Sequence, residues 1–357
     1  MNGSLVYEDY QKLILDKNIL GVKSIYNQIQ PSSLDLTLSE ECYEIKSSFL
    51  SSKNKIKDRL ADMIVKKIDL DHGAIFNKNK TYLVRLNEKL NLNDNICGLC
   101  NPKSSTGRLD IFCRTVLNYC DEYEKIPLNY FGEIFLEITC RSFNIRFQKG
   151  DSLNQMRLIF NQNNYLNDTD LIEFNKKNSI LFDENNKTIV PYVDNGLKVS
   201  VDLSMNNKIN AFRANKNAPI LLFNKINVHN ISDFWTSIKL KENYLLIERD
   251  HFYILKSKEK IRIPPNMAGE MVPYDTGIGD FRVHYAGFFD PGFGNPNGSY
   301  AVLEVKTNEV PFLLEDGQTI ARIKYEKLNK DSRVVYGSDI KSNYQNQGLT
   351  LSKHFKK

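Results

Sequence analysis

A short polar segment in the first third of the chain has the residue types that bind phosphate groups. It reads Lys103-Ser104-Ser105-Thr106-Gly107-Arg108. Arginine offers a planar fork of donors, lysine offers a point charge, and a loop of serine and glycine exposes backbone N–H groups. Together these groups suit a triphosphate. An ordinary polar turn is the alternative interpretation of the same residues.

Two glutamates stand in the same setting in the two halves of the chain. Glu137 lies in the apolar segment 134–138, and Glu304 lies in the apolar segment 301–305. Alternation along a strand directs each glutamate to the face opposite its two apolar neighbours. A carboxylate placed in this way can transfer protons if a pocket surrounds it, whereas a salt-bridged or solvent-facing strand glutamate is the alternative.

The glutamates belong to a series of matching positions that all have one spacing. Three pairs are each 167 positions apart: Asp35 and Asp202, Glu137 and Glu304, and Gly150 and Gly317. Three coincidences at one offset are hard to obtain by chance, so the sequence predicts a duplicated domain.

The elements that must position these residues are predicted to be mostly β-strands. Short alternating segments such as 81–86 and 261–263 are punctuated by glycine, proline and asparagine. Apolar spacing predicts a helix between Leu5 and Ile19, and a second one between Ile56 and Val65. The region 161–187, rich in asparagine and aspartate, is expected to contain an inter-domain linker. We therefore predict a mainly β protein with a few short helices and two domains, residues 1–165 and 166–357.

Composition narrows the class of protein and of partner. The chain has 357 residues, of which 41% are hydrophobic, and a formal net charge of +5. A mild positive charge suits a polyanionic small molecule, and the lack of a dense basic stripe argues against nucleic acid. No apolar run approaches the ~20 residues that cross a membrane, and no signal peptide is expected. All six cysteines lie in the first 140 residues, which favours reduced thiols and a cytoplasmic location.

Four segments also form a recognisable series along the chain. They are residues 30–36, residues 103–109, residues 286–294 followed by 302–304, and residues 343–348 with 350–352. In this order they resemble the dCTP deaminase family, a branch of the trimeric dUTPase-like fold. The second resembles the family's phosphate motif, the third its Asp-Pro-Gly turn and glutamate strand, and the fourth its C-terminal tail. A tandem chain of this length is similar to a long form of the deaminase. The resemblance implies two tandem dUTPase-like domains, each a β-clip or distorted β-barrel.

Each half departs from the family pattern where the other half keeps it. The first half has residues 121–123 where Asp-Pro-Gly is expected, and the second has residues 275–279 where Ser-Ser-x-x-Arg is expected. We therefore expect one composite site, with the phosphate loop of the first domain and the base pocket and tail of the second.

The resemblance implies the reaction and the residues that perform it. The expected reaction converts dCTP to dUTP and ammonia in the supply of pyrimidine deoxynucleotides. Glu304 would take a proton from the attacking water and pass it on, and burial would raise its pKa toward the working range. Glu137 is the duplicate candidate. No metal is expected at the reacting carbon, and Mg²⁺ is expected on the triphosphate.

The expected substrate contacts come from four places along the chain. They are Lys103, Ser104, Ser105 and Arg108 for the triphosphate; His284, Tyr285 and Ala286 for the base; Asp290 for the sugar 3′-hydroxyl with Val302 and Leu303 on the glutamate strand; and Tyr344 and Gln347 in the closing tail.

Zinc chemistry and other functions on the same fold are the alternatives. None of the five histidines is followed by glutamate two residues later, and Cys97 and Cys100 form a lone C-x-x-C pair. The sequence therefore lacks the motifs of the zinc deaminases, and no zinc is expected. A dUTPase, a bifunctional deaminase–dUTPase and a degenerate nucleotide-binding protein remain open. The expected partners are dCTP, dUTP and dTTP as an inhibitor, and a trimer of two-domain chains would form a pseudo-hexamer.

Overall fold

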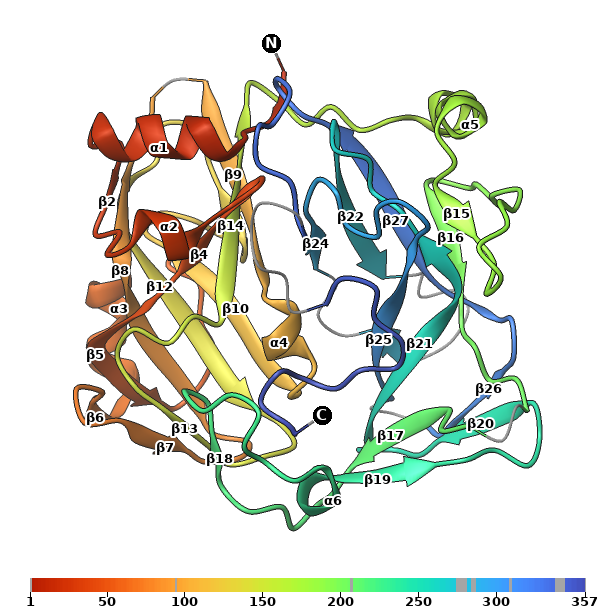
Figure 1. Cartoon of the computed structure of the whole chain (residues 1–357). Helices are drawn as coiled ribbons and strands as arrows, with labels where there is room; N and C mark the ends of the chain where they lie inside the picture. The colour runs from red at the N-terminus through yellow and green to blue at the C-terminus, as the bar shows by residue number, and fades with distance from the viewer. Residues whose placement is uncertain are drawn as a thin grey trace.

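The computed structural model describes residues 2–93, 95–205, 208–273, 281–283, 287–307, 310–337 and 344–356. Over these ranges the secondary structure is dominated by β-strands, which confirms the prediction of a mainly β protein. The strands form two groups that lie side by side, one from each half of the sequence (Figure 1).

The first half contains two large sheets and contributes to a small third one. One sheet has, in order, β11 (Lys125–Ile126), β9 (Ile96–Pro102), β14 (Asn154–Phe160), β4 (Ser33–Leu36) and β3 (Ile29–Gln30), and β1 (Gly3–Ser4) also pairs with β14. The second has β10 (Ile111–Leu117), β12 (Phe131–Cys140), β8 (Thr81–Asn91), β5 (Leu38–Ile45) and β6 (Ile64–Asp69), with β2 (Ile19–Leu20) on β8. The third joins β7 (Ala74–Phe76) and β13 (Ile145–Phe147) to β18 (Leu221–Leu222) of the second half.

The second half has its own sheets. One has β19 (Trp235–Ile238), β17 (Ala211–Ala214), β21 (Phe252–Ile261), β25 (Ser299–Thr307) and β23 (Phe281–Val283), with β15 (Leu181–Phe182) on β21. Another has β16 (Leu197–Ser200), β27 (Thr319–Lys327), β22 (Met267–Pro273) and β24 (Phe288–Phe289). The last is the pair β20 (Tyr244–Ile247) and β26 (Phe312–Glu315).

Strand order repeats between the halves around the matching residues. The order β10-β12-β8 carries Glu137 on its central strand, and β23-β25-β21 carries Glu304 on its central strand. The order β4-β14-β9 likewise matches β16-β27-β22. Gly150 and Gly317 both have positive φ, at 90° and 77°, in the turn before β14 or β27. The spacing of 167 positions therefore corresponds to a repeat of topology.

The helices are short and lie at the edges of the sheets. They are α1 (Tyr7–Leu15), α2 (Ile25–Gln28), α3 (Ile56–Met63), α4 (Ser104–Gly107), α5 (Asp168–Lys177) and α6 (Ile231–Phe234). Helix α1 ends earlier than apolar spacing predicts, because Lys17 adopts a φ of 60° and Ile19 then enters β2. The expected linker region contains α5, whose first turn is capped by the Asn167 side chain.

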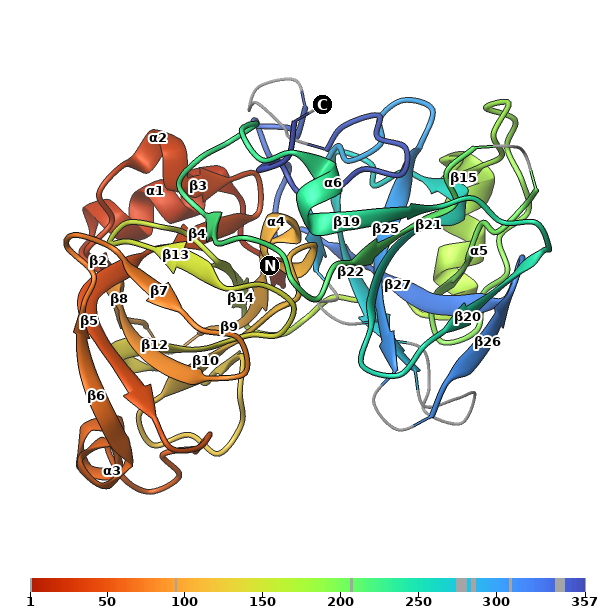
Figure 2. The ribbon, with the colours of Figure 1, turned by 90° about the horizontal axis from the view of Figure 1, so that it is seen from below.

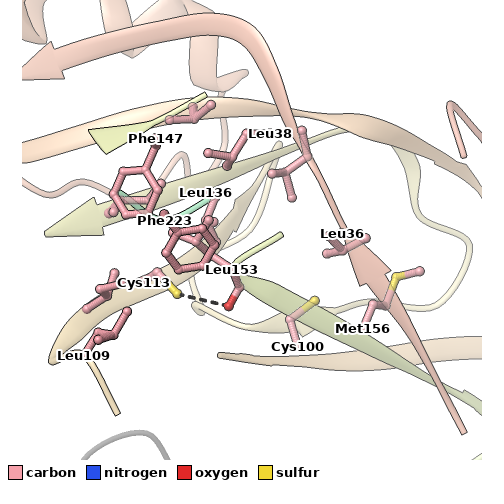
Figure 3. Close-up of a cluster of buried hydrophobic side chains, with 14 of the residues drawn as sticks. Leu36, Leu38, Cys100, Leu109, Cys113, Leu136, Phe147, Leu153, Met156 and Phe223 are labelled. Atoms are coloured by element: carbon pink, nitrogen blue, oxygen red, sulfur yellow. Dashed lines mark hydrogen bonds between the residues drawn. The ribbon is translucent and has the colours of Figure 1, made fainter. Parts of the chain in front are cut away.

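The core of the first half continues across the boundary between the halves. Phe223, from the second half of the sequence, packs on Phe147 with a ring-centroid distance of 5.1 Å (Figure 3). The same core includes Trp235 and Phe355, so the segment around β17–β19 and the end of the chain both pack against the first half. In Figure 2, α6 and the C-terminus lie between the two groups of strands. No helix among the residues placed by the structure is long and apolar enough to span a membrane.

Candidate functional site

A cavity of about 520 Å³ lies between the two halves of the chain. The first half contributes α2, β4, the α4 segment and β14, and the second contributes β22, β24, β25 and the C-terminal tail. Its lining includes Lys103, Ser104, Ser105 and Arg108 from the first half, and Asp290, Val302, Glu304, Tyr344 and Gln347 from the second. The structure therefore brings the phosphate-binding segment and the β25 glutamate to one cavity.

Arg108 lines this cavity from the C-terminal end of helix α4. The segment turns sharply because the N–H groups of Thr106 and Gly107 both donate to the carbonyl of Lys103. Arg108 is the last residue of the turn and is only 2% exposed. Its guanidinium donates to the Gln347 side chain at 2.8 Å and to the Thr350 carbonyl at 2.9 Å. An arginine of the first half is thus held by groups of the tail.

Glu304 lies on the cavity face of β25 and is 4% exposed. Burial raises the pKa of its carboxyl to about 8, and the nearby positive charge of Arg108 partly opposes that rise. A carboxyl with such a pKa exchanges protons readily near neutral pH, which is what a general acid and base requires.

The C-terminal tail closes one side of the cavity. The ring of Tyr344 lies 3.9 Å from the Arg108 guanidinium, which is the distance of a cation–π contact. Gln347 also donates to the Tyr300 carbonyl at 2.9 Å, so it joins Arg108 to the start of β25. Ser352 donates to the Ser105 carbonyl at 2.8 Å. Beyond the cavity, the Phe355 ring packs against Phe234 and Trp235.

Asp290 enters the cavity from the turn that follows β24. Burial raises the pKa of its carboxyl to about 6; the positive charge of Arg157 opposes this rise and the negative charge of Asp35 adds to it. Arg157 belongs to β14 of the first half, and its guanidinium donates to the carbonyls of Gly269 and Phe289 at 3.0 and 3.2 Å. One buried arginine thus supports the cavity wall of the other half. The turn itself needs glycine, because Gly292 has a φ of 96° and a Cβ there would lie 2.1 Å from Val335.

Two lysines line the cavity beside α4. Lys103 forms an ion pair with Asp35. Lys353, from the tail, also lines the cavity, and its pKa is lowered by burial and by the charge of Lys103. Two lysines that repel each other in one cavity provide a place for a multiply charged anion. Sequence reasoning missed Lys353, although it lies only six residues beyond Gln347.

Two of the predicted site residues lie elsewhere. Leu303 is fully buried in the core of the second half, because alternation along β25 directs it away from the face of Val302 and Glu304. Its side chain therefore does not line the cavity, and the predicted substrate contact could be made only by its backbone. Glu137 also lies away from this cavity: it accepts hydrogen bonds from Arg114 at 2.6 Å and from Ser48 at 2.8 Å. His284, Tyr285 and Ala286 lie outside the described residues.

The arrangement fits a ligand with an anionic end and a polar ring. Lys103, Lys353 and Arg108 supply positive charge to the cavity. Glu304 supplies a buried carboxyl to the same cavity, and Val302, Phe288 and Phe289 supply apolar side chains. Such a cavity can hold a nucleotide and transfer a proton at its base.

Family models and a solved structure match most of the chain. Residues 1–162 match the family model of the 2′-deoxycytidine 5′-triphosphate deaminase N-terminal domain, and residues 167–355 match that of its C-terminal domain. Among solved structures, the chain is similar to the crystal structure of 2′-deoxycytidine 5′-triphosphate deaminase from Agrobacterium tumefaciens. The two are 35% identical, with a TM-score of 0.87, over 93% of this chain and 99% of that chain. No curated protein sequence matches the chain.

Proposed function

The chain belongs to the dCTP deaminase family, and we propose that the cavity between its two halves is where it hydrolyses dCTP to dUTP and ammonia. The observation that carries this proposal is the meeting of Arg108, from the first half, with Glu304, from the second, in one cavity. The first half lacks the family's Asp-Pro-Gly turn, and the second half lacks its Ser-Ser-x-x-Arg motif. A complete set of motifs therefore exists only where the two halves meet.

Glu304 is proposed as the general acid and base. It would take a proton from the water that attacks C4 of cytosine and deliver it to the ring nitrogen N3. It would then take the proton of the new C4 hydroxyl and pass it to the amino group, which leaves as ammonia while the C4 carbonyl forms. Its pKa of about 8 supports this role, because both protonation states are accessible near neutral pH. Glu137 is proposed not to take part, since Arg114 and Ser48 already bind its carboxylate outside the cavity.

The triphosphate is proposed to bind at Lys103, Ser104, Ser105, Arg108 and Lys353. Charge supports this: burial and, to a smaller extent, the positive charge of Lys103 lower the pKa of Lys353, and an anion bound by both lysines would offset the repulsion between them. Mg²⁺ is proposed to accompany the triphosphate, held by phosphate oxygens and water. Tyr344 and Gln347 would close over the phosphates, since both already contact Arg108.

The rest of the cavity is proposed to hold the nucleoside. Asp290 would accept a hydrogen bond from the sugar 3′-hydroxyl, and its position on the cavity wall supports that contact. Val302 and Phe289 would form apolar contacts with the sugar and base. The segment 284–286 is proposed to recognise the base edge. The same cavity would also accept dUTP as product and dTTP as an inhibitor, because both are pyrimidine deoxynucleoside triphosphates.

Finer features of the architecture are also part of the proposal. Each half is proposed to be a dUTPase-like β-clip domain, with domains 1–165 and 166–357, and the repeated strand order supports this. Association of three chains into a pseudo-hexamer is supported by the exposed apolar side chains of the β20–β26 pair, which include Leu246 and Leu313. A cytoplasmic location is supported by six cysteines without disulfides.

Product analysis tests the reaction directly. Purified enzyme with Mg²⁺ is incubated with dCTP and, separately, with dUTP, while ammonia and pyrophosphate are both measured. Release of ammonia from dCTP with no pyrophosphate from either nucleotide is the expected result. Pyrophosphate release from dUTP would add a dUTPase activity. Binding of dCTP without any ammonia would refute the proposal and favour a nucleotide-binding protein.

A further inference from the structure

A buried ion pair joins the two halves beside the cavity. The Nζ atom of Lys306, on β25 of the second half, lies 3.4 Å from an oxygen of Asp110, in the first half. The two side chains are 7% and 1% exposed. Neither residue lines the cavity, so the pair has no direct part in holding a nucleotide.

The two residues have matching positions relative to the proposed site. Lys306 is two residues beyond Glu304 on β25, so alternation places both on the same face of the strand. Asp110 is two residues beyond Arg108, in the turn that leads from α4 into β10. Along β25 an acidic residue, Glu304, precedes a basic one, Lys306. In the turn after α4 a basic residue, Arg108, precedes an acidic one, Asp110. The charge of Arg108 acts on Glu304, and Lys306 forms an ion pair with Asp110.

Asp110 is fixed from within its own half. Its N–H donates to the Gly107 carbonyl at 3.0 Å, and its carbonyl accepts from the N–H of Arg141 at 2.9 Å. Ser142 donates to the same carboxylate oxygen that Lys306 approaches, at 2.6 Å. Asp110 also has a φ of 54°, a left-handed conformation that few residues other than glycine adopt. The turn thus presents the carboxylate to Lys306 in a single orientation.

Stability alone does not account for this arrangement. Removing two charges from water costs several kcal/mol, and a buried ion pair often stabilises a protein no better than apolar residues of similar volume. The left-handed backbone of Asp110 adds a further cost. A buried ion pair can instead fix the register of the two surfaces that it joins, because a shifted register leaves both charges buried and unpaired.

We propose that Lys306 and Asp110 are positioning residues, which lock the α4 turn onto β25 so that Arg108 stands in working register with Glu304. The inference rests on the proposed function, because it gives Arg108 and Glu304 their roles. Catalysis would then also require an ion pair outside the cavity, which aligns the two halves of the chain.

The test is steady-state deamination of dCTP by Lys306→Met, Asp110→Asn and the double variant, with kcat and KM measured from pH 5.5 to pH 9. Each variant is expected to lose at least about tenfold in kcat, since small displacements of catalytic groups have large effects on rate. The rising limb of the pH profile should move to higher pH, because a displaced Arg108 no longer lowers the pKa of Glu304. The double variant should be no slower than the slower single variant, and Lys306→Arg should recover most of the rate.

Arg114→Met is the matched control, since it breaks an ion pair with the buried Glu137 that lies within the first half only. It should lower the melting temperature and leave kcat and the pH profile unchanged. The double variant leaves neither charge buried alone, so it stays informative if a single variant does not fold. Wild-type kcat and an unmoved pH profile in the folded double variant would overturn the inference. Failure of the wild-type chain to release ammonia would instead refute the proposed function.

Discussion

Replacing Glu304 with glutamine should abolish deamination and at the same time make the empty protein more stable at neutral pH. Glutamine keeps the size and polarity of the protonated acid, but its amide neither gains nor loses a proton near neutral pH. Loss of general acid and base catalysis of this kind costs about 10²–10⁴ in rate. The gain in stability has a separate origin, since at neutral pH the folded protein keeps Glu304 protonated whereas the unfolded chain leaves it free to ionise.

The structure gives the size and the sign of the stability change. The pKa of Glu304 is raised from 4.5 to about 8, because the folded protein buries the carboxyl. The folded state therefore holds a proton that the unfolded state releases, and stability falls as pH rises from about 4.5 to about 8. Integrating from pH 4.5 to pH 7 gives a cost of about 3 kcal/mol, and the cost at pH 5 is below about 1 kcal/mol. Glu304→Gln removes this dependence.

Chemical denaturation of wild type and Glu304→Gln at pH 5 and pH 7, without nucleotide, measures the effect. The difference in unfolding free energy should favour the variant and should be larger at pH 7. Glu137→Gln is the matched control: it weakens the bond to Arg114, so it should destabilise the protein at both pH values and leave ammonia release intact. A Glu304→Gln variant that is less stable at pH 7 than wild type, or that still turns over dCTP, would refute the reasoning.

Three further predictions concern Lys353, which lines the cavity, and Phe355 and Arg157, which lie outside it. Lys353→Met should raise KM for dCTP about tenfold with little change in kcat, and the effect should shrink with dCMP, as steady-state kinetics would show. Phe355→Ala should free the tail from its aromatic contacts, with faster proteolysis of the C-terminal segment and a higher KM. Arg157→Met should lower the unfolding free energy by about 2–4 kcal/mol in denaturant titrations, because it removes hydrogen bonds to three carbonyls and the ion pair with buried Asp290.

Local sequence patterns predicted the parts of the fold that depend on neighbours along the chain. Alternation and turn residues indicated strands, and α3 begins at Ile56 as apolar spacing predicted. The constant spacing of Glu137 and Glu304 indicated the repeat, and the complementary loss of motifs led us to expect Arg108 and Glu304 in one cavity. Their catalytic roles stay predictions.

Contacts between the halves could not be predicted in this way. Arg157 binds carbonyls more than 100 residues away, and the partner of Lys306 is 196 residues away. No periodicity links such positions, because their approach depends on how the two sets of sheets pack. Leu303 shows the opposite case: strand alternation directs it into the core, whereas the family motif had suggested a substrate contact.

Because one chain supplies both walls of the cavity, formation of the site does not depend on association between chains. The loop that carries Arg108 and the strand that carries Glu304 are tethered, so their effective concentration is set by the polypeptide and does not change with dilution. A site formed between separate subunits would be lost when those subunits dissociate. Here each chain should keep its full catalytic capacity at nanomolar enzyme concentrations, whatever larger assembly it joins.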